Sequence, residues 1–292
     1  MSRAGFVALA GRPNVGKSTL VNRLVGEKVA ITSDRPQTTR RAIRGIRRQD
    51  DAQVILLDLP GFQRPRDALT GRMQARVERE LSDSDAALMV INGEEGVGAG
   101  DRFIAGLLSA AKLPVVLAVN KCDRLDSART VEALAAAASL DPSDEIFPVS
   151  ARTGEGVEAL AARLGELMPE GPFLFPEDAV SDQPEATAVA ELVREQAIRR
   201  TFEEVPHAVE AVVEEIDRNE DPTRVRVLLW VESESQKGIL VGRGGSMVKA
   251  IGTAARSEIQ DLLGEKVHLD LSVRVRKGWR SDDALLDRLG ID

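Results

Sequence analysis

A glycine-rich stretch near the start of the chain has the residue types that bind phosphate. Residues 11–18 read Gly-Arg-Pro-Asn-Val-Gly-Lys-Ser, which matches the pattern G-x-x-x-x-G-K-[ST]. Glycines let backbone N–H groups surround phosphate oxygens, and the N-terminus of a following helix adds a favourable dipole. In this pattern Lys17 supplies positive charge to the β- and γ-phosphates, and Ser18 supplies a hydroxyl ligand for Mg²⁺. The stretch therefore predicts a nucleoside-triphosphate site.

A second motif, Asn120-Lys121-Cys122-Asp123, selects the base and follows the apolar run 114–119. A carboxylate only accepts hydrogen bonds, so Asp123 can bind both the N1–H and the exocyclic N2 amine of guanine. Adenine lacks donors at those places. Lys121 can lie along the base, and Asn120 can connect this loop to the phosphate loop. These residues predict a guanine nucleotide.

Three short motifs complete the expected site. Asp58 ends a buried run and can reach Mg²⁺, and the Gly61 amide can sense the γ-phosphate. Thr39 lies in a polar loop and can close over Mg²⁺, and Ser150 and Ala151 can offer backbone N–H groups to guanine O6. The expected nucleotide-binding set is Gly11, Asn14, Val15, Gly16, Lys17, Ser18, Thr19, Asp58, Asn120, Lys121, Asp123, Ser150 and Ala151, with Ser18, Thr39 and Asp58 as the Mg²⁺ ligands.

The residue after the D-x-x-G motif raises a problem for hydrolysis. Ras-like GTPases orient water with a glutamine there, but Phe62 cannot hydrogen-bond water, and the next residue, Gln63, would be expected to point in a different direction. Either hydrolysis is slow or another group stabilises the transition state. Asn14 is a candidate, although it can also be a simple turn residue after Pro13. The expected catalytic set is Lys17, Asn14, Thr39 and Gly61.

Alternating elements position these loops. Strands are expected at the apolar runs 6–10, 54–57, 86–91, 114–119 and 146–149. Helices are expected over 18–25, 71–81, 101–111, 130–139 and 157–167. This alternation predicts an α/β fold, with a mostly parallel sheet covered by helices on both faces. Ligands of such sheets bind beyond the carboxyl ends of the strands, where the motifs fall.

A proline-rich, acidic segment over 169–184 marks a domain boundary. We expect a GTPase domain over 1–170, a linker over 171–185 and an α+β domain over 186–292. The later elements are expected as a helix over 185–204, strands over 208–217 and 225–231, a short helix, a glycine turn, a helix over 246–263 and a strand over 267–275. Their order matches a type II KH-like fold.

The glycine turn, Gly242-Arg243-Gly244-Gly245, carries the pattern G-x-x-G. Alone this pattern is usually a turn, but between helices and strands it favours a KH domain, which clamps about four nucleotides on such a loop. Trp279 can stack on RNA or pack in the core. The expected RNA-binding set is Lys237, Gly242, Arg243, Gly244, Gly245, Lys249, Arg274, Arg276, Lys277 and Arg280.

Composition agrees with this division. The 292 residues carry a net charge of −8, yet residues 224–280 contain 11 Lys+Arg and 6 Asp+Glu, whereas 177–221 contain 4 and 14. No apolar run approaches the roughly 18 residues that span a bilayer, and the N-terminus lacks signal-peptide features. The single cysteine excludes an internal disulfide. We therefore expect a cytoplasmic protein.

From Gly5 to about Leu289 the chain resembles the Era GTPases. The resemblance rests on VGKSTLVNRL, PQTTR, EGPFLFPED, REQAIRRTFEEVPHAV and QKGILVGRGGSMVKAIGTAARSEI. It implies a switch that uses GTP, GDP and Mg²⁺, binds 16S rRNA near its 3′ end and assists assembly of the 30S subunit. Leu59 departs from the family's usual threonine. Peripheral association with the cell membrane is a family trait for which this sequence offers no anchor, and no obligate protein partner is evident.

The chain also resembles GTPases with a hydrophobic residue after D-x-x-G, in which an asparagine of the phosphate loop helps to hold K⁺. This likeness implies a K⁺ ion near Asn14 and hydrolysis that K⁺ stimulates. Other interpretations remain open, namely a constitutive RNA-binding scaffold with a structural nucleotide, a GTPase acting on another RNA, and an RNA-modifying enzyme. The sequence shows no spare catalytic cluster for the last of these.

Overall fold

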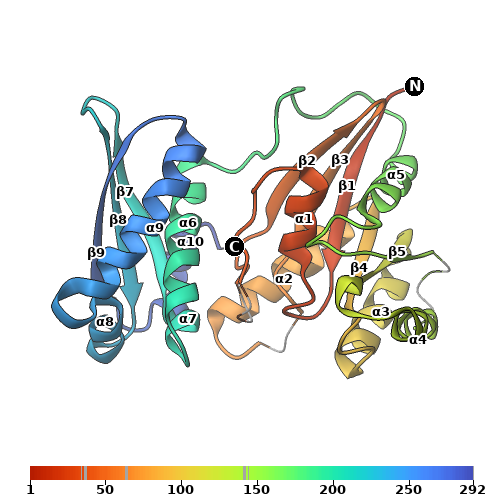
Figure 1. The fold of residues 1–292 in the computed structure, drawn as a ribbon, viewed down its shortest axis with the longest axis horizontal. Coiled ribbons are helices and arrows are strands. Elements are labelled where there is room, and N and C mark those ends of the chain that lie inside the picture. Colours follow the sequence, from red (N-terminus) through yellow and green to blue (C-terminus); the bar gives the residue numbers. More distant parts are fainter. Residues whose placement is uncertain (34, 36–37, 63–64, 141–142, 144, 292) are drawn as a thin grey trace. The chain divides into compact units, whose positions relative to one another are not determined.

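The chain forms two compact units in a computed structural model that describes residues 1–33, 35, 38–62, 65–140, 143 and 145–291 (Figure 1). The first unit comprises residues 1–32, 39–66 and 70–182. The second comprises residues 33–38, 67–69 and 183–292. Within the described residues, no helix is long and apolar enough to cross a membrane.

The first unit is built on a six-stranded sheet in the order β2-β3-β1-β4-β5-β6. Five strands run parallel, and one edge strand is antiparallel. The strands are β1 (Arg3–Ala10), β2 (Ile43–Gln49), β3 (Ala52–Asp58), β4 (Ala86–Asn92), β5 (Val115–Asn120) and β6 (Ile146–Pro148). Because β3 and β4 lie on opposite sides of β1, the order reverses there, and ligands of α/β sheets bind at such a point.

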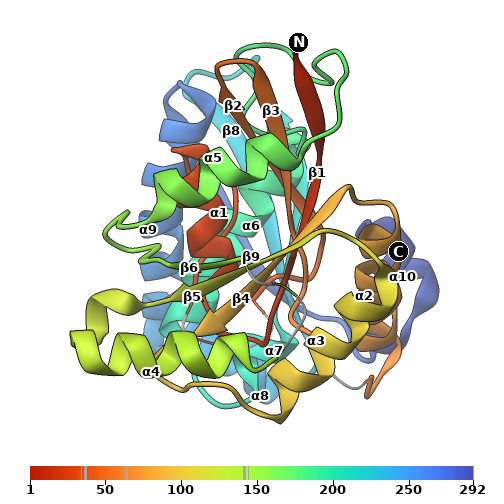
Figure 2. The same cartoon turned by 90° about the vertical axis from the view of Figure 1, so that its right-hand side faces the viewer.

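Helices cover both faces of this sheet, which confirms the predicted fold class. One face packs against α1 (Lys17–Val25) and α5 (Val157–Leu167). The other packs against α2 (Ala68–Ser82), α3 (Ala99–Ala111) and α4 (Ser127–Ala138). Figure 2 shows α1 and α5 on one side of the strands and α2 and α3 on the other. Every residue of β3, β4 and β5 is buried, as a sheet covered on both faces requires.

Strand β2 was not expected from the sequence. Its residues, IRGIRRQ, include three arginines, and only Ile43, Gly45 and Ile46 are buried. Arg47 donates to the Leu24 carbonyl and pairs with Glu158 at 2.6 Å. A charged strand is stable at a sheet edge because only one side needs a partner, and its charges discourage pairing with another chain.

The second unit has a three-stranded sheet in the order β7-β8-β9. Strand β7 (Glu210–Asp217) is antiparallel to β8 (Thr223–Val231), which is parallel to β9 (Val267–Val275). Helices α6 (Glu185–Arg200), α8 (Glu234–Val241) and α9 (Ser246–Leu263) share one apolar core with it. The helix over 246–263 and the strand over 267–275 are confirmed. The first helix ends at Arg200, before the expected residue 204.

Trp279, in the C-terminal part of this unit, lies in the core. Its indole is fully buried, and its Nε1–H donates to the Ala208 carbonyl at 3.0 Å. Trp279 therefore packs in the core and is not an RNA-stacking residue. Two short helices, α7 (Val205–Ala208) and α10 (Asp283–Arg288), were not expected.

A buried glutamine fixes the proline-rich segment to the first unit. Gln53 on β3 accepts hydrogen bonds from the backbone N–H groups of Leu174 and Phe175 at 2.8 and 3.0 Å. Its Nε2 donates to the Phe175 carbonyl at 2.9 Å. Ser181 adds a hydrogen bond from its hydroxyl to the Arg44 carbonyl. The segment is thus attached by these side-chain hydrogen bonds together with two isolated backbone bridges, Arg3 with Glu170 and Gly45 with Ser181, rather than by a strand of its own.

We predict that Gln53→Ala lowers the free energy of unfolding of the first unit by about 1–2 kcal/mol, because it leaves partly buried backbone groups without their partner. Limited proteolysis should then cut within 170–182 faster than in the wild type. Gln74→Ala is the matched control, since Gln74 makes only an exposed bond to Glu78. Equal cleavage rates in both variants would contradict this role of Gln53.

Candidate functional site

The predicted phosphate loop joins β1 to α1 at the switch point of the sheet. Gly16 precedes α1 with φ +98°, a conformation that glycine adopts without strain. A Cβ on Gly16 would lie 2.4 Å from Nδ2 of Asn120. The motif glycine is therefore required by its backbone and by its close contact with the predicted base loop.

Lys17 is buried beneath this loop. Its Nζ donates to the carbonyls of Gly11 and Arg12 at 3.0 and 3.2 Å. Burial lowers the pKa of Lys17 from 10.5 to about 8, although the nearby Asp58 carboxylate opposes this shift. A buried ammonium with only carbonyl partners is poorly compensated, so a phosphate group placed at the loop would stabilise it.

Asp58, Ser18 and Thr39 meet where the sequence predicts Mg²⁺. Oδ2 of Asp58 accepts hydrogen bonds from the Ser18 hydroxyl at 2.6 Å and the Thr39 hydroxyl at 3.2 Å. The two hydroxyl oxygens are 3.1 Å apart. Burial raises the pKa of Asp58, against the hydrogen bond from Ser18 and the charge of Lys17.

This oxygen cluster fits Mg²⁺. Oδ1 of Asp58 is buried and, within the described part of the chain, has no hydrogen-bond partner. Mg²⁺ prefers oxygen ligands and is usually held by one or two carboxylates together with substrate phosphates. The same residues contain no group of three or more His, Cys, Asp and Glu side chains that could hold a metal alone.

The base loops are joined by Asn120, as expected. Its Nδ2 donates to the Val15 carbonyl at 2.9 Å, and its Oδ1 accepts from the Ala151 N–H at 2.9 Å. The Ala151 N–H therefore already has a hydrogen-bond partner in this structure. Its contact with guanine O6 stays a prediction. Asp123 accepts from the Ser150 hydroxyl at 2.7 Å.

The other predicted residues lie around the same edge. Asn14 and Lys121 both have positive φ, at 64° and 68°. Gly61 packs against the phosphate loop, where an added Cβ would be 3.0 Å from Pro13. Phe62 is buried in the core and cannot orient water, whereas Gln63 lies outside the described residues. Val15 is buried and Thr19 belongs to α1.

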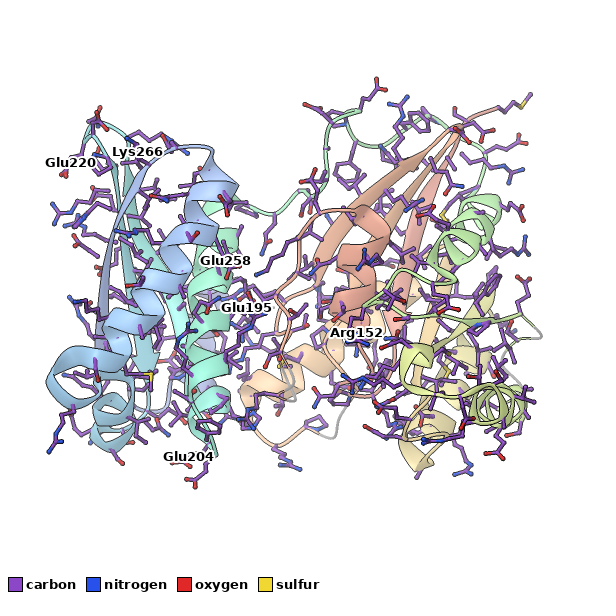
Figure 3. All side chains as sticks on the ribbon, in the orientation of Figure 1. Arg152, Glu195, Glu204, Glu220, Glu258 and Lys266 are labelled. Atoms are coloured by element: carbon purple, nitrogen blue, oxygen red, sulfur yellow. The ribbon has the colours of Figure 1, made fainter. Side chains whose placement is uncertain are left out.

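Two arginines of the site were missed because their partners are distant in sequence. Arg12, in the phosphate loop, pairs through Nε with the fully buried Asp101 of α3 at 2.8 Å. Arg152, labelled in Figure 3, follows β6 and pairs through Nη2 with Asp123 at 2.6 Å. Only the position of Arg152, directly after Ser150 and Ala151, gave a sequence signal.

The predicted RNA-binding loop connects α8 to α9 in the second unit. Gly242, Gly244 and Gly245 have φ values of +71°, +58° and +80°. A Cβ on Gly242 would meet the Met247 backbone at 2.8 Å, so this glycine closes the turn. Beside Gly244 and Gly245 the described residues leave open space. The loop can therefore accept a group as large as a phosphate next to the N-terminus of α9.

A pocket of about 240 Å³ lies between α9 and β9. Its charged and polar lining comes from Lys249, Thr253 and Arg256 of α9, which lie on one helical face, and from His268 of β9. Lys249 was predicted, whereas Arg256 and His268 were not. The spacing of Lys249 and Arg256, seven residues apart, was the available signal.

The remaining predicted basic residues do not line this pocket. Lys237 belongs to α8, and Lys277 follows β9. Arg274 lies 4.0 Å from Glu214, Arg276 packs over the Trp230 ring, and Arg280 pairs with Asp67. The structure therefore divides the predicted basic set: Arg243 and Lys249 belong to the loop and the pocket, Arg274, Arg276 and Arg280 contact protein groups, and Lys237 and Lys277 belong to neither group.

Comparison with known proteins covers the whole chain. A family model described as a 50S ribosome-binding GTPase matches residues 6–121, and a KH domain model matches residues 204–280. The chain is 44% identical to GTPase Era of Lactobacillus helveticus, with 99% of this chain and 96% of that protein aligned. It is 45% identical to GTPase Era of Mycobacterium tuberculosis, with 98% of each aligned.

Solved structures match equally well. One is a crystal structure of Era in complex with MgGDPNP and nucleotides 1506–1542 of 16S ribosomal RNA, with a TM-score of 0.96, 33% identity, and coverage of 100% of this chain and 99% of that one. The other is an Aquifex aeolicus Era variant bound to GDP and AlF₄⁻, with a TM-score of 0.95, 34% identity and 99% coverage of both chains.

We predict that nucleotide changes the titration of Lys17. Without nucleotide its ammonium should lose its proton near pH 8, so the free energy of unfolding should rise from about pH 8 to the unfolded value near 10.5. With GDP and Mg²⁺ the phosphates should stabilise the charged form and raise the pKa of Lys17. NMR titration of the Lys17 side chain, assigned through Lys17→Arg, measures both values. Equal midpoints with and without GDP would contradict contact between Lys17 and phosphate.

Proposed function

Because the chain belongs to the Era family of GTPases, we propose that it is a GTP-controlled switch that binds 16S rRNA near its 3′ end and assists assembly of the 30S subunit. One observation carries this proposal: an Era structure that matches the entire chain holds MgGDPNP and nucleotides 1506–1542 of 16S rRNA. This chain would contact those ligands at the phosphate loop and at the glycine loop. The phosphate loop lies within the region that matches the GTPase model, and the glycine loop lies within the region that matches the KH domain model.

In the proposed site, Lys17 and the α1 N-terminus bind the β- and γ-phosphates, and Asp123 accepts from guanine. Ser18, Thr39 and Asp58 hold Mg²⁺, which neutralises charge on the phosphates. The Gly61 amide faces the γ-phosphate from beside Pro13. GTP is the substrate and GDP the product.

Hydrolysis in this site is proposed to be slow and to depend on K⁺. Phe62 is 7% exposed and packs with apolar residues of the sheet, so it supplies no hydrogen bond to the attacking water. The transition state then needs positive charge from another source near the bridge between the β- and γ-phosphates. Asn14 has an amide oxygen suited to K⁺ and lies in the phosphate loop at φ 64°, a conformation that asparagine tolerates.

We expect GTP hydrolysis to be roughly tenfold or more faster in K⁺ than in Na⁺, because charge stabilisation in a pre-organised site is worth at least that much. Asn14→Gly should abolish the difference. Glycine is the appropriate replacement, since it removes the side chain and still adopts positive φ. Rates under GTP saturation in matched K⁺ and Na⁺ buffers provide the measurement.

Two results would contradict a K⁺ site at Asn14. One is equal wild-type rates in the two buffers. The other is stimulation by K⁺ that survives in Asn14→Gly. GDP binding, measured in parallel, shows whether the variant still folds around its nucleotide.

RNA is proposed to bind the glycine loop and the adjoining pocket. Backbone N–H groups at the start of α9 and the side chain of Arg243 would hold phosphates, which can approach because Gly244 and Gly245 carry no side chains. Lys249 and Arg256 extend the positive charge into the pocket. The predicted residues Lys237, Gly242, Arg274, Arg276, Lys277 and Arg280 remain candidates for contacts beyond it.

Gly244→Asp tests this loop with little steric cost. Its backbone, at φ +58°, lies in a region that Asp and Asn tolerate, and no described atom lies within 4 Å of the added Cβ. The added carboxylate should weaken binding of the 16S 3′ end by roughly tenfold or more through repulsion of phosphate. Gly244→Asn is the matched control, with the same shape and no charge, and should lose much less.

Binding is measured with the full chain loaded with GDPNP or with GDP. The proposed switch requires tighter binding of the 16S 3′ end in the GDPNP state. Equal binding in both states would favour a constitutive scaffold, and selective binding of another RNA would overturn the 16S assignment. Equal affinity of Gly244→Asp and Gly244→Asn would remove the loop from the RNA site.

A further inference from the structure

Asp123 is held by two partners on the same loop. The Ser150 hydroxyl donates to its Oδ1 at 2.7 Å, and Arg152 donates through Nε to its Oδ2 at 2.9 Å, with Nη2 2.6 Å from the same oxygen. Each carboxylate oxygen has two lone pairs, so about four hydrogen bonds are available in all. Acceptor capacity therefore remains on Asp123 for two donors of a base.

The backbone of Arg152 is fixed in place, unlike that of an ordinary surface residue. Arg23 of α1 donates through Nε to the Ala151 carbonyl at 3.1 Å and through Nη2 to the Arg152 carbonyl at 2.5 Å. The Ser150 hydroxyl also accepts from the Thr153 N–H at 3.1 Å. These bonds reduce the ordering cost that makes most exposed ion pairs weak.

The pair is asymmetric in its exposure. The side chain of Asp123 is 8% exposed, whereas that of Arg152 is 70% exposed. The guanidinium thus reaches from solvent to a largely covered carboxylate. The hydrogen bond from Ser150 and then the charge of Arg152 hold the pKa of Asp123 below its ordinary value, against the effect of burial.

We propose that Arg152 is a positioning residue for guanine, which fixes the plane of the Asp123 carboxylate so that both oxygens face the base. This inference rests on the proposed GTP site and adds to it the residue that sets base discrimination. A planar guanidinium suits the role because it binds a carboxylate in a fixed geometry, which the point charge of lysine does not.

The test compares GDP with IDP, whose base lacks the N2 amine and so makes one bond fewer to Asp123. Binding is measured on the full chain with Mg²⁺ for the wild type and for Arg152→Ala. We expect Arg152→Ala to weaken GDP binding about three- to tenfold, within the range of an exposed charge-assisted bond. IDP binding should weaken less, so the preference for GDP over IDP should fall.

Two further variants separate positioning from a general change in charge. Arg152→Lys keeps the charge without the planar fork and should recover only part of the GDP preference. Arg124→Ala is the matched control, because Arg124 lies next to Asp123 and pairs instead with Glu94. It should keep the wild-type preference. A general loss of charge or of stability would affect GDP and IDP equally.

Three results would overturn the inference. They are an unchanged GDP preference in Arg152→Ala, an equal loss of preference in Arg124→Ala, and tighter GDP binding in Arg152→Ala. The last would mean that the arginine competes with the base for Asp123. Each of these leaves GDP binding by the wild type intact, whereas failure of the wild type to bind GDP at all would refute the proposed function itself.

Discussion

The nucleotide site depends on the amide of Asn120. This buried side chain bonds the phosphate loop through the Val15 carbonyl and the following base loop through the Ala151 N–H. The backbone carbonyl of Asn120 accepts from the N–H of Gly93, the residue after the neighbouring strand β4. The loops that follow β1, β4, β5 and β6 are thus fixed to one another by a residue at the end of β5. Gly16 must be a glycine because this amide occupies the space of a Cβ.

Near the loops that Asn120 joins, the buried side chains of Lys17 and Asp58 lack a full counter-charge from the protein. Burial lowers the pKa of Lys17 and raises that of Asp58, so each would be more stable with an added counter-charge. Phosphate would compensate the first and Mg²⁺ the second. Lys17 and Asp58 neutralise each other only incompletely, because the Lys17 ammonium donates to backbone carbonyls and the Asp58 carboxylate accepts from hydroxyls. Binding of a phosphate together with Mg²⁺ would thus lower the energetic cost of burying both groups.

Sequence patterns predict the parts of the fold whose structure is determined by the residues within one continuous segment. The apolar runs of the parallel sheet and the helix over 246–263 are of this kind, as are the motif residues Lys17, Asp58 and Asn120. Strand β2 escapes prediction because its arginines are stable only at the edge that tertiary pairing creates. Arg152 and the pocket lined by Arg256 escape for the same reason, since their partners are distant in sequence or lie on another element.

The two glycine loops have the same backbone conformation just before a helix. Gly16 precedes α1 and Gly245 precedes α9, both in the left-handed conformation, and the described side chains make no cap hydrogen bond at either helix start. The first backbone N–H groups of α1 are therefore available to a phosphate, whereas at the start of α9 the Ser246 N–H donates to the Arg243 carbonyl. The loops differ in what surrounds them. Asn120 limits the space beside Gly16, which suits one nucleotide of defined geometry, whereas the space beside Gly245 is open and suits a continuous phosphate backbone.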